Sequence, residues 1–295
     1  MNKILVTGGV GFIGYHLIKR LINKYEITII DNLQRGKMDN DFKNLLSNKN
    51  VTWKRFPSDI FFLKKIAVGS ELITTEYAVL SADDDFLIPT ALQECLDFLI
   101  KNTDYSSVQG LCFTHNIYKK SGHTDLRLIP FHKGKALSLE QNSPCDRISS
   151  YMKDGKYYPM YSIHKKSSFT SIWKEADKYV DGQGLSELLP CCLSLLKGKM
   201  KVLPNFYNLR EPNNFDGWGD EEALSKVYSE ERVGRASSGL ANHLSKATNL
   251  SSKESKKFSQ EVFKAYLDIV YKKQEWKLRS NSGFHGILMT LRQRL

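Results

Sequence analysis

YAVLSADDDFLIP, residues 77–89, joins a strand to a cluster of acids and then to a helix. The first four residues are apolar and favour β structure, so they predict a buried strand. Pro89 stands where a helix begins, and Leu92, Leu96 and Leu99 follow at helical spacing. A buried strand, a polar turn and an amphipathic helix in this order are typical of an α/β protein.

The three acids after this strand, Asp83–Asp85, indicate a metal site. Consecutive carboxylates repel one another, and this repulsion raises their pKa values. A divalent cation relieves the repulsion, and Mg²⁺ or Mn²⁺ prefers such oxygen ligands and bridges to a diphosphate. The alternative is a solvated turn that caps the next helix, for which one Asp is enough.

The N-terminus predicts a dinucleotide-binding unit. Residues 3–14 read KILVTGGVGFIG, a strand that runs into glycines, and a helical pattern and a second apolar strand then follow. In this arrangement Gly8 makes the tight turn, Gly11 lets a pyrophosphate approach, and Gly14 lets the helix pack on the strand. Asp31 ends the second strand, where it would hold an adenosine ribose. The alternative is that the unit is kept for folding and binds nothing.

This N-terminal stretch resembles the extended short-chain dehydrogenases, the family of nucleotide-sugar epimerases and dehydratases. The residues that match are 7–14 and 31–33, and the resemblance covers about the first fifty residues. It implies that Gly8, Gly11 and Asp31 bind NAD.

That family moves protons with a Ser and a Tyr-x-x-x-Lys pair, in which Lys lowers the Tyr pKa. Tyr161 and Lys165 have this spacing, and Ser149 and Ser150 precede them. No strand carrying the family's Ser-containing segment leads into the pair. An NAD-dependent epimerase is therefore the alternative function.

The central part of the chain resembles family-2 glycosyltransferases, which have the GT-A fold. The resemblance rests on residues 75–89 and continues through 95–106, CLDFLIKNTDYS. It implies that Asp83 lies near the nucleoside of a nucleotide-sugar donor. Asp84 or Asp85 would then bind Mn²⁺ or Mg²⁺.

A second acidic segment, DGQGLSELL at residues 181–189, precedes a helix that ends near Gly198 and a strand at 200–203. It resembles the glycosyltransferase helix whose carboxylate deprotonates the acceptor hydroxyl. Glu187 is the expected general base, with Asp181 as the second candidate. The alternative is that Glu187 is a surface residue of the first helical turn that stabilises the helix dipole.

Two further residues have both a functional and a structural interpretation. His164 would line the acceptor pocket in the glycosyltransferase resemblance, although a lone His is more often structural. Arg210 could meet the diphosphate with its guanidinium fork, or form an exposed ion pair with Glu211.

Length and charge narrow the classes of function. The chain has 295 residues, enough for one large domain or two modest ones, and a formal net charge of +11. Because its basic residues are spread along the whole chain, we expect no nucleic acid but anionic nucleotides or lipid phosphates as partners. No stretch approaches the ~20 apolar residues of a membrane span. The five cysteines form no CxxC pair, as expected in a reducing cytoplasm.

The C-terminal region is polar over residues 211–257. Ser251 and Glu254 have the spacing of a capping box, which predicts a helix to about Lys277. The apolar face of this helix would carry Phe258, Val262, Tyr266 and Ile269. The last segment, residues 284–295, mixes apolar and basic residues, so it would rest on an anionic membrane or dock on the core.

Together these patterns predict an α/β fold with an open, mostly parallel Rossmann-like sheet flanked by helices and a C-terminal helical extension. We expect an epimerase-like unit at 1–50, a GT-A-like core at 51–210 and a helical region at 211–295. The predicted function is metal-dependent transfer of a sugar from a nucleotide donor to a hydroxyl of a glycan or lipid-linked acceptor. We expect it in surface polysaccharide synthesis, in the cytoplasm or at the inner face of the membrane. A nucleotide-binding remnant without turnover is a further alternative.

Overall fold

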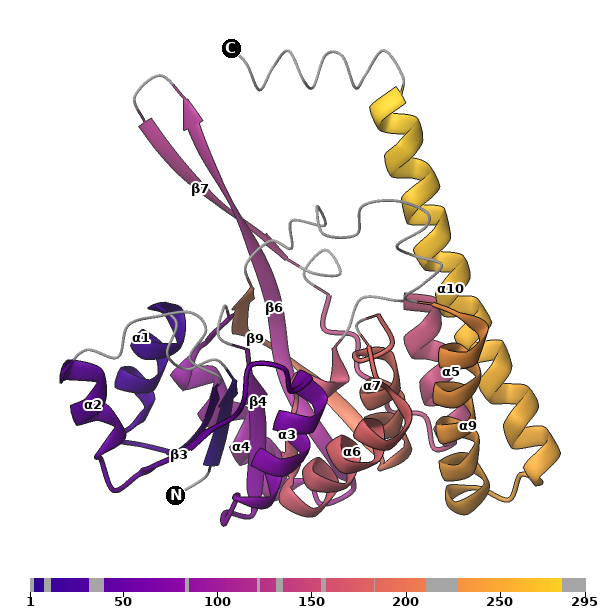
Figure 1. Ribbon diagram of the computed structural model, residues 1–295, viewed down its shortest axis with the longest axis horizontal. Helices are drawn as coiled ribbons and strands as arrows, with labels where there is room; N and C mark the ends of the chain where they lie inside the picture. The colour runs from indigo at the N-terminus through magenta and orange to yellow at the C-terminus, as the bar shows by residue number, and fades with distance from the viewer. Residues whose placement is uncertain are drawn as a thin grey trace.

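The computed structural model has one layer of strands with helices packed against it (Figure 1). The residues that it describes are 3–7, 12–31, 40–82, 85–120, 123–130, 135–154, 158–182, 184–210 and 228–282. A two-stranded hairpin and a long helix extend from this body on the same side (Figure 1).

Four neighbouring strands run parallel and form one half of a nine-stranded sheet. In spatial order they are β3 (Val51–Arg55), β2 (Glu26–Asp31), β1 (Lys3–Thr7) and β4 (Tyr77–Ser81). The helices between them are α1 (Phe12–Leu21), α2 (Asn40–Leu46) and α3 (Phe62–Glu71). Ile4 of β1 lies opposite Ile27 on one side and Val79 on the other. The epimerase-like residues and the strand before the acids therefore share one continuous sheet.

The other half of the sheet is mixed. After β4 it continues with β8 (Ile163–Lys165), β6 (Tyr105–Lys120), β9 (Lys199–Arg210) and β5 (Asp85–Leu87), and β7 (His123–Pro130) pairs with β6. β8 is antiparallel to both its neighbours, while β6 and β9 are parallel. The predicted α/β class with flanking helices is confirmed. The sheet is less parallel than predicted, because β5, β7 and β8 all pair antiparallel.

Alternate side chains of the strands enter two cores, as the two-residue repeat of a strand requires. Tyr77 and Val79 pack with helix α1 and helix α4 (Pro89–Lys101), whereas Ala78 and Leu80 enter the opposite core. That second core includes α3, α5 (Pro144–Asp154), α6 (Lys166–Tyr179) and α7 (Leu188–Leu196). Burial on both faces explains why β4 is an uninterrupted apolar run.

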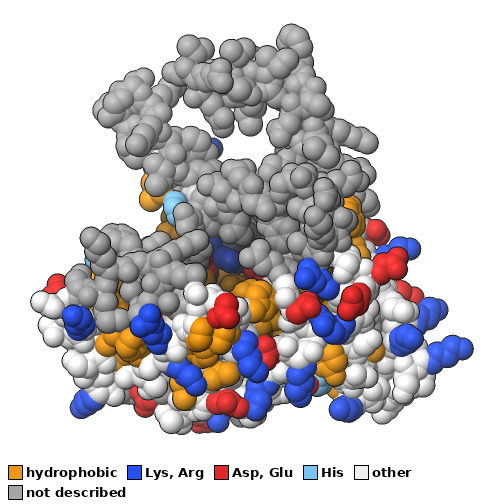
Figure 2. All heavy atoms as spheres, viewed as in Figure 1, with side chains coloured by type: hydrophobic (Ala, Val, Ile, Leu, Met, Phe, Trp, Pro, Cys, Tyr) orange, Lys and Arg blue, Asp and Glu red, His pale blue; other side chains and the backbone are white. Residues whose placement is uncertain are grey.

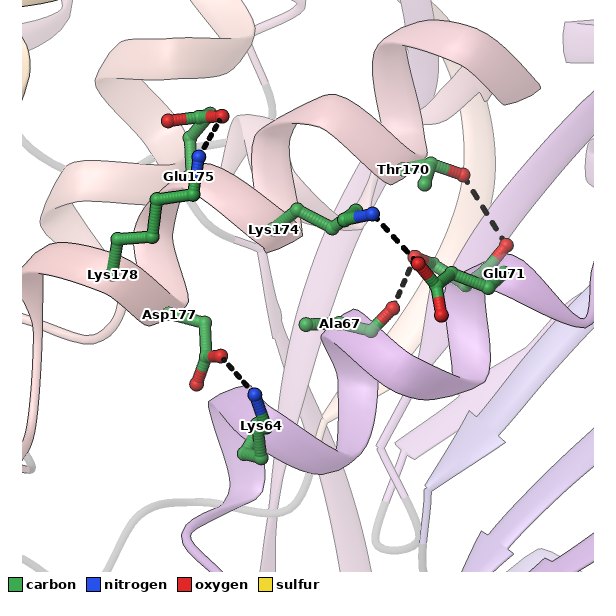
Figure 3. A network of polar contacts seen from close by, with 9 residues as sticks. Lys64, Ala67, Glu71, Thr170, Lys174, Glu175, Asp177 and Lys178 are labelled. Atoms are coloured by element: carbon green, nitrogen blue, oxygen red, sulfur yellow. Dashed lines mark hydrogen bonds and ion pairs between the residues drawn. The ribbon is translucent and has the colours of Figure 1, made fainter.

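Helices α3 and α6 are joined by exposed ion pairs as well as by the core (Figure 3). Lys64 Nζ lies 3.2 Å from Asp177, and Lys174 Nζ lies 2.7 Å from Glu71. Exposed pairs of this kind contribute roughly 0–1 kcal/mol each, so apolar packing dominates the contact. Basic and acidic side chains are likewise interspersed over the described part of the face in Figure 2.

The C-terminal extension consists of α9 (Glu230–Ala247) and α10 (Ser252–Ser282). The predicted capping box is present: the backbone N–H of Glu254 donates to Ser251 Oγ at 3.2 Å, and that of Ser251 donates to Glu254 Oε2 at 2.8 Å. Val262 is buried against the core, as predicted. The polar tract before the capping box did not predict α9, which buries small residues such as Ala236 and Gly239.

Two properties of the described helices and thiols bear on the predicted surroundings of the protein. None of the helices within the described ranges is long and apolar enough to cross a membrane. All five cysteines are free thiols, and Cys95, Cys191 and Cys192 are buried. Residues 284–295, for which we predicted membrane contact or docking, lie outside the described residues.

Candidate active site

The site lies at the carboxyl edge of the parallel strands. Val6 of β1 is directly beside Ser81 of β4, and the two strands end at Thr7 and Ser81. The chain leaves β1 toward β2 and β3, while β4 lies on its other side, so this is a topological switch point, where open α/β sheets bind ligands. The predicted site residues Gly8, Gly11, Asp83 and Asp84 come directly after these strand ends but lie outside the described residues.

Two residues of the predicted dinucleotide unit are described. Gly14 is buried in α1, where a glycine allows close packing. Asp31 is the last residue of β2, is buried, and accepts a hydrogen bond at its backbone carbonyl from the N–H of Phe56 at 2.8 Å. Both positions agree with the strand–helix–strand arrangement expected from the sequence.

Asp85 begins β5 and lies opposite Arg210, the last residue of β9. Arg210 Nε is 3.3 Å from Asp85 Oδ2, and Asn208 Nδ2 donates to the same oxygen at 3.4 Å. The Asp85 side chain is only 2% exposed and that of Arg210 is 10% exposed. The pair is therefore a buried ion pair at the carboxyl edge, whereas Glu211, the partner considered as the alternative, lies outside the described residues.

Two tyrosines hold the guanidinium of Arg210. Its Cζ lies 4.4 Å from the ring centre of Tyr158 and 4.9 Å from that of Tyr161. Tyr161 belongs to a short 3₁₀ helix, η2 (Pro159–Tyr161). Burial lowers the pKa of Arg210, but Tyr161, Asp85, Tyr158 and Glu187 together outweigh burial and raise this pKa above its ordinary value. Arg210 therefore stays cationic, and its ring contacts restrict where it can point.

Glu187 belongs to the same electrostatic cluster. It is half-buried and precedes the first residue of α7, but its carboxylate makes no capping hydrogen bond there. Burial first, and then the charge of Glu187, raises the pKa of Tyr158 to about 12. Glu187 also helps to raise the pKa values of Tyr228 and Tyr266. The fold thus brings the charges of Glu187, Arg210 and Asp85 close together.

Asp181, the second candidate for the base, has a different environment. Its carboxylate pairs with Arg235 and with Arg232 of α9, the latter with Nε at 3.4 Å. The hydrogen bond from Arg235 holds the pKa of Asp181 below its ordinary value. A half-exposed carboxylate between two guanidinium groups is a weak base, so the geometry favours Glu187.

His164 is a structural residue of the second half of the sheet. It is 1% exposed, and its Nε2 lies 3.0 Å from the carbonyl oxygen of Pro159. Burial lowers its pKa to about 4, so the ring is neutral near pH 7. A ring enclosed in this way does not line an acceptor pocket.

The predicted epimerase pair does not come together. Tyr161 ends η2, and the chain from Ser162 to Lys165 is extended, so it carries Lys165 roughly 13 Å along the backbone. The cation that contacts the Tyr161 ring is Arg210.

The three acids were predicted to hold a divalent cation. No group of three His, Cys, Asp or Glu side chains that could bind a metal occurs in the described part of the chain, from which Asp83 and Asp84 are missing. Asp85 fits such a site in chemistry, because carboxylate oxygens are the ligands that Mg²⁺ or Mn²⁺ prefers.

Several members of the cluster were not predicted from the sequence. Asn208 contacts Asp85 because β9 pairs antiparallel with β5, a register that no local pattern reveals. Tyr158, Tyr228 and Tyr266 come from three distant parts of the chain. Of these three, Tyr266 was predicted, as part of the apolar face of the C-terminal helix.

Comparison with known sequences gives short matches, and the family match lies at the N-terminus. A model of the "NAD dependent epimerase/dehydratase family" matches residues 4–59. The "Putative UDP-glucose 4-epimerase" of Methanocaldococcus jannaschii is 55% identical over 38 residues, 12% of this chain and 12% of that protein. The "Probable UDP-arabinose 4-epimerase 3" of Oryza sativa subsp. japonica is 56% identical over 39 residues, 13% of this chain and 10% of that protein. The chain thus spans only about an eighth of the relatives it matches.

Comparison of structures matches nearly the whole chain. The crystal structure of S. aureus TarS 1-349 is similar with a TM-score of 0.55 and 12% identity, over 96% of this chain and 74% of that one. Its complex with UDP-GlcNAc gives a TM-score of 0.56 and 13% identity, over 91% and 73% of the two chains. Both predicted resemblances are confirmed: nearly the whole chain shares its fold with the TarS structures, and residues 4–59 match the epimerase/dehydratase family model.

Proposed function

We propose that this protein transfers a sugar from a nucleotide-sugar donor to a hydroxyl of a glycan or lipid-linked acceptor. The observation that carries the proposal is the buried ion pair of Asp85 and Arg210 at the carboxyl edge of the sheet, with half-buried Glu187 close enough to act on the charge of Arg210. The fold supports it as well, because the similar TarS structure has been solved with UDP-GlcNAc and with UDP.

In this proposal Arg210 lies beside the diphosphate of the donor. The guanidinium is fixed by Tyr158, Tyr161 and Asp85, so it needs little reorganisation when negative charge builds up on the leaving group. Asp84 and Asp85 would hold Mn²⁺ or Mg²⁺, and this Lewis acid would supply positive charge beside the departing diphosphate. Asp83 would contact the nucleoside.

Glu187 acts as the general base. It takes the proton of the acceptor hydroxyl as the acceptor oxygen bonds to the anomeric carbon and the bond from that carbon to the diphosphate breaks. Glu187 is half-buried, and it lies close enough to Arg210 for the two charges to interact.

The test is binding followed by turnover. Thermal shift is measured with UDP, GDP, CMP, dTDP and NAD, each with and without Mn²⁺. Stabilisation by one nucleoside diphosphate that requires Mn²⁺ supports the proposal and identifies the donor class. Release of that nucleotide from its sugar donor is then compared for the wild type, Asp85→Asn and Glu187→Gln. Asp177→Asn, which removes a carboxylate from an exposed ion pair on α6, is the matched control. No nucleoside diphosphate binding, or full turnover by Asp85→Asn, contradicts the proposal.

A second candidate function is supported by the family match over residues 4–59, namely NAD binding at the N-terminal unit. Buried Gly14 and buried Asp31 would serve it together with Gly8 and Gly11. Stabilisation by NAD without metal, lost in Asp31→Ala, supports NAD binding, and an epimerase would also lose turnover in Tyr161→Phe. Stabilisation by a nucleoside diphosphate alone excludes it.

The setting of the reaction is also part of the proposal. Free thiols suit a reducing compartment, so we place the protein on the cytoplasmic side of the membrane. On that side the protein would encounter the acceptor of a surface polysaccharide.

A further inference from the structure

A tight turn before helix α7 carries Glu187. Gly184 opens this turn with φ 85°, a left-handed conformation that favours glycine. Leu185 and Ser186, which follow it, are buried, so the turn rests on the core. Glu187 then leads into α7, and its carbonyl oxygen accepts a hydrogen bond from the N–H of Cys191 at 3.1 Å. The conformation of Gly184 therefore sets the direction in which the chain reaches Glu187.

Helix α10 of the C-terminal extension holds this turn from outside. The helix packs against α9 and α5 (Figure 1), and the hydroxyl of its Tyr266 donates a hydrogen bond to the carbonyl oxygen of Gly184 at 3.1 Å. The two residues are 82 positions apart in the chain, so the contact exists only when the extension is docked. One hydroxyl group of α10 is thus joined to the turn that carries Glu187.

Two neighbours of Tyr266 keep this hydroxyl in place and protonated. The ring of Tyr228, a buried residue, meets the ring of Tyr266 edge to face, with 6.2 Å between the ring centres. Burial first, then Tyr228 and the charge of Glu187, raise the pKa of Tyr266 above its ordinary value. The phenol of Tyr266 is therefore a fixed hydrogen-bond donor, and it lies close enough to Glu187 to feel its charge.

We propose that Tyr266 is a positioning residue for the transfer reaction, which places Glu187 by holding the carbonyl group of Gly184. This inference rests on the proposed function, in which Glu187 is the general base. A general base must come within hydrogen-bond reach of the acceptor hydroxyl, roughly 2.6–3.2 Å, so a small shift of the turn slows proton transfer. Without the Tyr266 hydroxyl the carbonyl of Gly184 loses this partner, and a glycine backbone has many other conformations to adopt.

A purely structural role for the same hydrogen bond has different consequences. If the bond only stabilised the docking of α10, its loss would lower the midpoint of thermal unfolding and leave kcat unchanged. If it positions Glu187, its loss slows the chemical step in a protein that still binds its donor. The two roles are therefore distinguished by kcat, the KM for the donor and the unfolding midpoint, measured together.

The test measures turnover of the nucleotide-sugar donor by the full chain and by Tyr266→Phe, which keeps the ring and removes only the hydroxyl. We expect kcat to fall about tenfold with an unchanged KM for the donor, because a misplaced base affects the chemical step alone. Tyr271→Phe is the matched control, since it removes a phenolic hydroxyl from an exposed position on the same helix. It should turn over like the wild type.

A double substitution shows whether Tyr266 acts through Glu187. In Glu187→Gln no base is left to position, so addition of Tyr266→Phe should change the remaining kcat less than twofold. A further tenfold loss in that background overturns the inference, and so does an unchanged kcat, or a raised KM alone, in Tyr266→Phe. Full turnover by Glu187→Gln contradicts the proposed function itself and removes the inference with it.

Discussion

Asp85 and Arg210 face each other across β5 and β9 as a buried ion pair, with 3.3 Å between Arg210 Nε and Asp85 Oδ2. The pair has two consequences. It fixes the position of Asp85, the one residue of Asp83–Asp85 that the structure describes. It also makes the pairing of β5, the last strand of the sheet, depend on the balance of charge at the candidate site.

Removal of Arg210 alone should destabilise the protein strongly. Arg210→Met leaves the Asp85 carboxylate buried without its cation, which typically costs about 3–5 kcal/mol of unfolding free energy. Asp85→Asn/Arg210→Met should recover much of that loss, because neither charge remains. Urea unfolding of the four proteins measures the coupling. Additive effects of the two substitutions would show that the two side chains do not interact.

Glu187 and Asp181 form a natural pair for comparison. Glu187→Gln should lower kcat about 100- to 10,000-fold with little change in donor affinity, as expected when a general base is lost. Asp181→Asn should leave kcat within a few fold, because its carboxylate serves the ion pairs with α9. Steady-state kinetics with the donor found by thermal shift gives both values. A large loss in Asp181→Asn with none in Glu187→Gln would reverse the assignment.

His164 should make the protein sensitive to mild acid. Burial holds its folded-state pKa at about 4, below the ordinary value of about 6.5, so below pH 6.5 the unfolded chain binds more protons. Stability is therefore intact above pH 6.5 and is lost as the pH falls toward 4, by about 3 kcal/mol in all. His164→Gln keeps a donor for the Pro159 carbonyl but does not titrate. In this variant the urea midpoint of unfolding should therefore depend less on pH between pH 6.5 and 4.5. The pKa of His243 is also lowered by burial, so a weaker dependence of stability on pH will remain in this variant.

Two glycines of α9 should respond to alanine in opposite directions. A Cβ on Gly239 would lie 2.6 Å from Cγ of Tyr179, so Gly239→Ala should push α9 away from α6 and cost about 1–3 kcal/mol. Gly234 has nothing within 4 Å of that position, and Gly234→Ala should gain about 0.5–1 kcal/mol from helix propensity. Thermal unfolding distinguishes the two. Equal effects would mean that α9 does not pack on Tyr179 in solution.

Features with a local signal were predictable from the sequence. The strand at 77–81, the leucines of α4 and the capping box at Ser251 all rest on neighbouring residues, and the structure confirms each.

Features that depend on distant pairing were not predictable. The hairpin of β6 and β7 lacks a regular apolar face, and α9 buries mostly small residues, such as Ala236, Ser237 and Gly239, which do not stand out in a polar tract. For the same reason, the sequence predicted only part of the candidate site. Asp85 and Glu187 stand in recognisable local segments, but the contact of Asp85 with Asn208 exists only through strand register.

The central position of β1 in the sheet limits which N-terminal segments could replace residues 1–31 by recombination. β1 pairs with β2 on one side and β4 on the other, so the junction between the epimerase-like residues and the rest falls inside a sheet. A recombined N-terminus must therefore present matching backbone hydrogen bonds along both edges of one strand, a stricter demand than compatibility at an interface between domains. A chain that lost residues 1–31 would expose the edge of β4, and such an edge pairs readily with other chains. The epimerase-like segment is thus tied to the solubility of the whole protein, whether or not it binds a nucleotide.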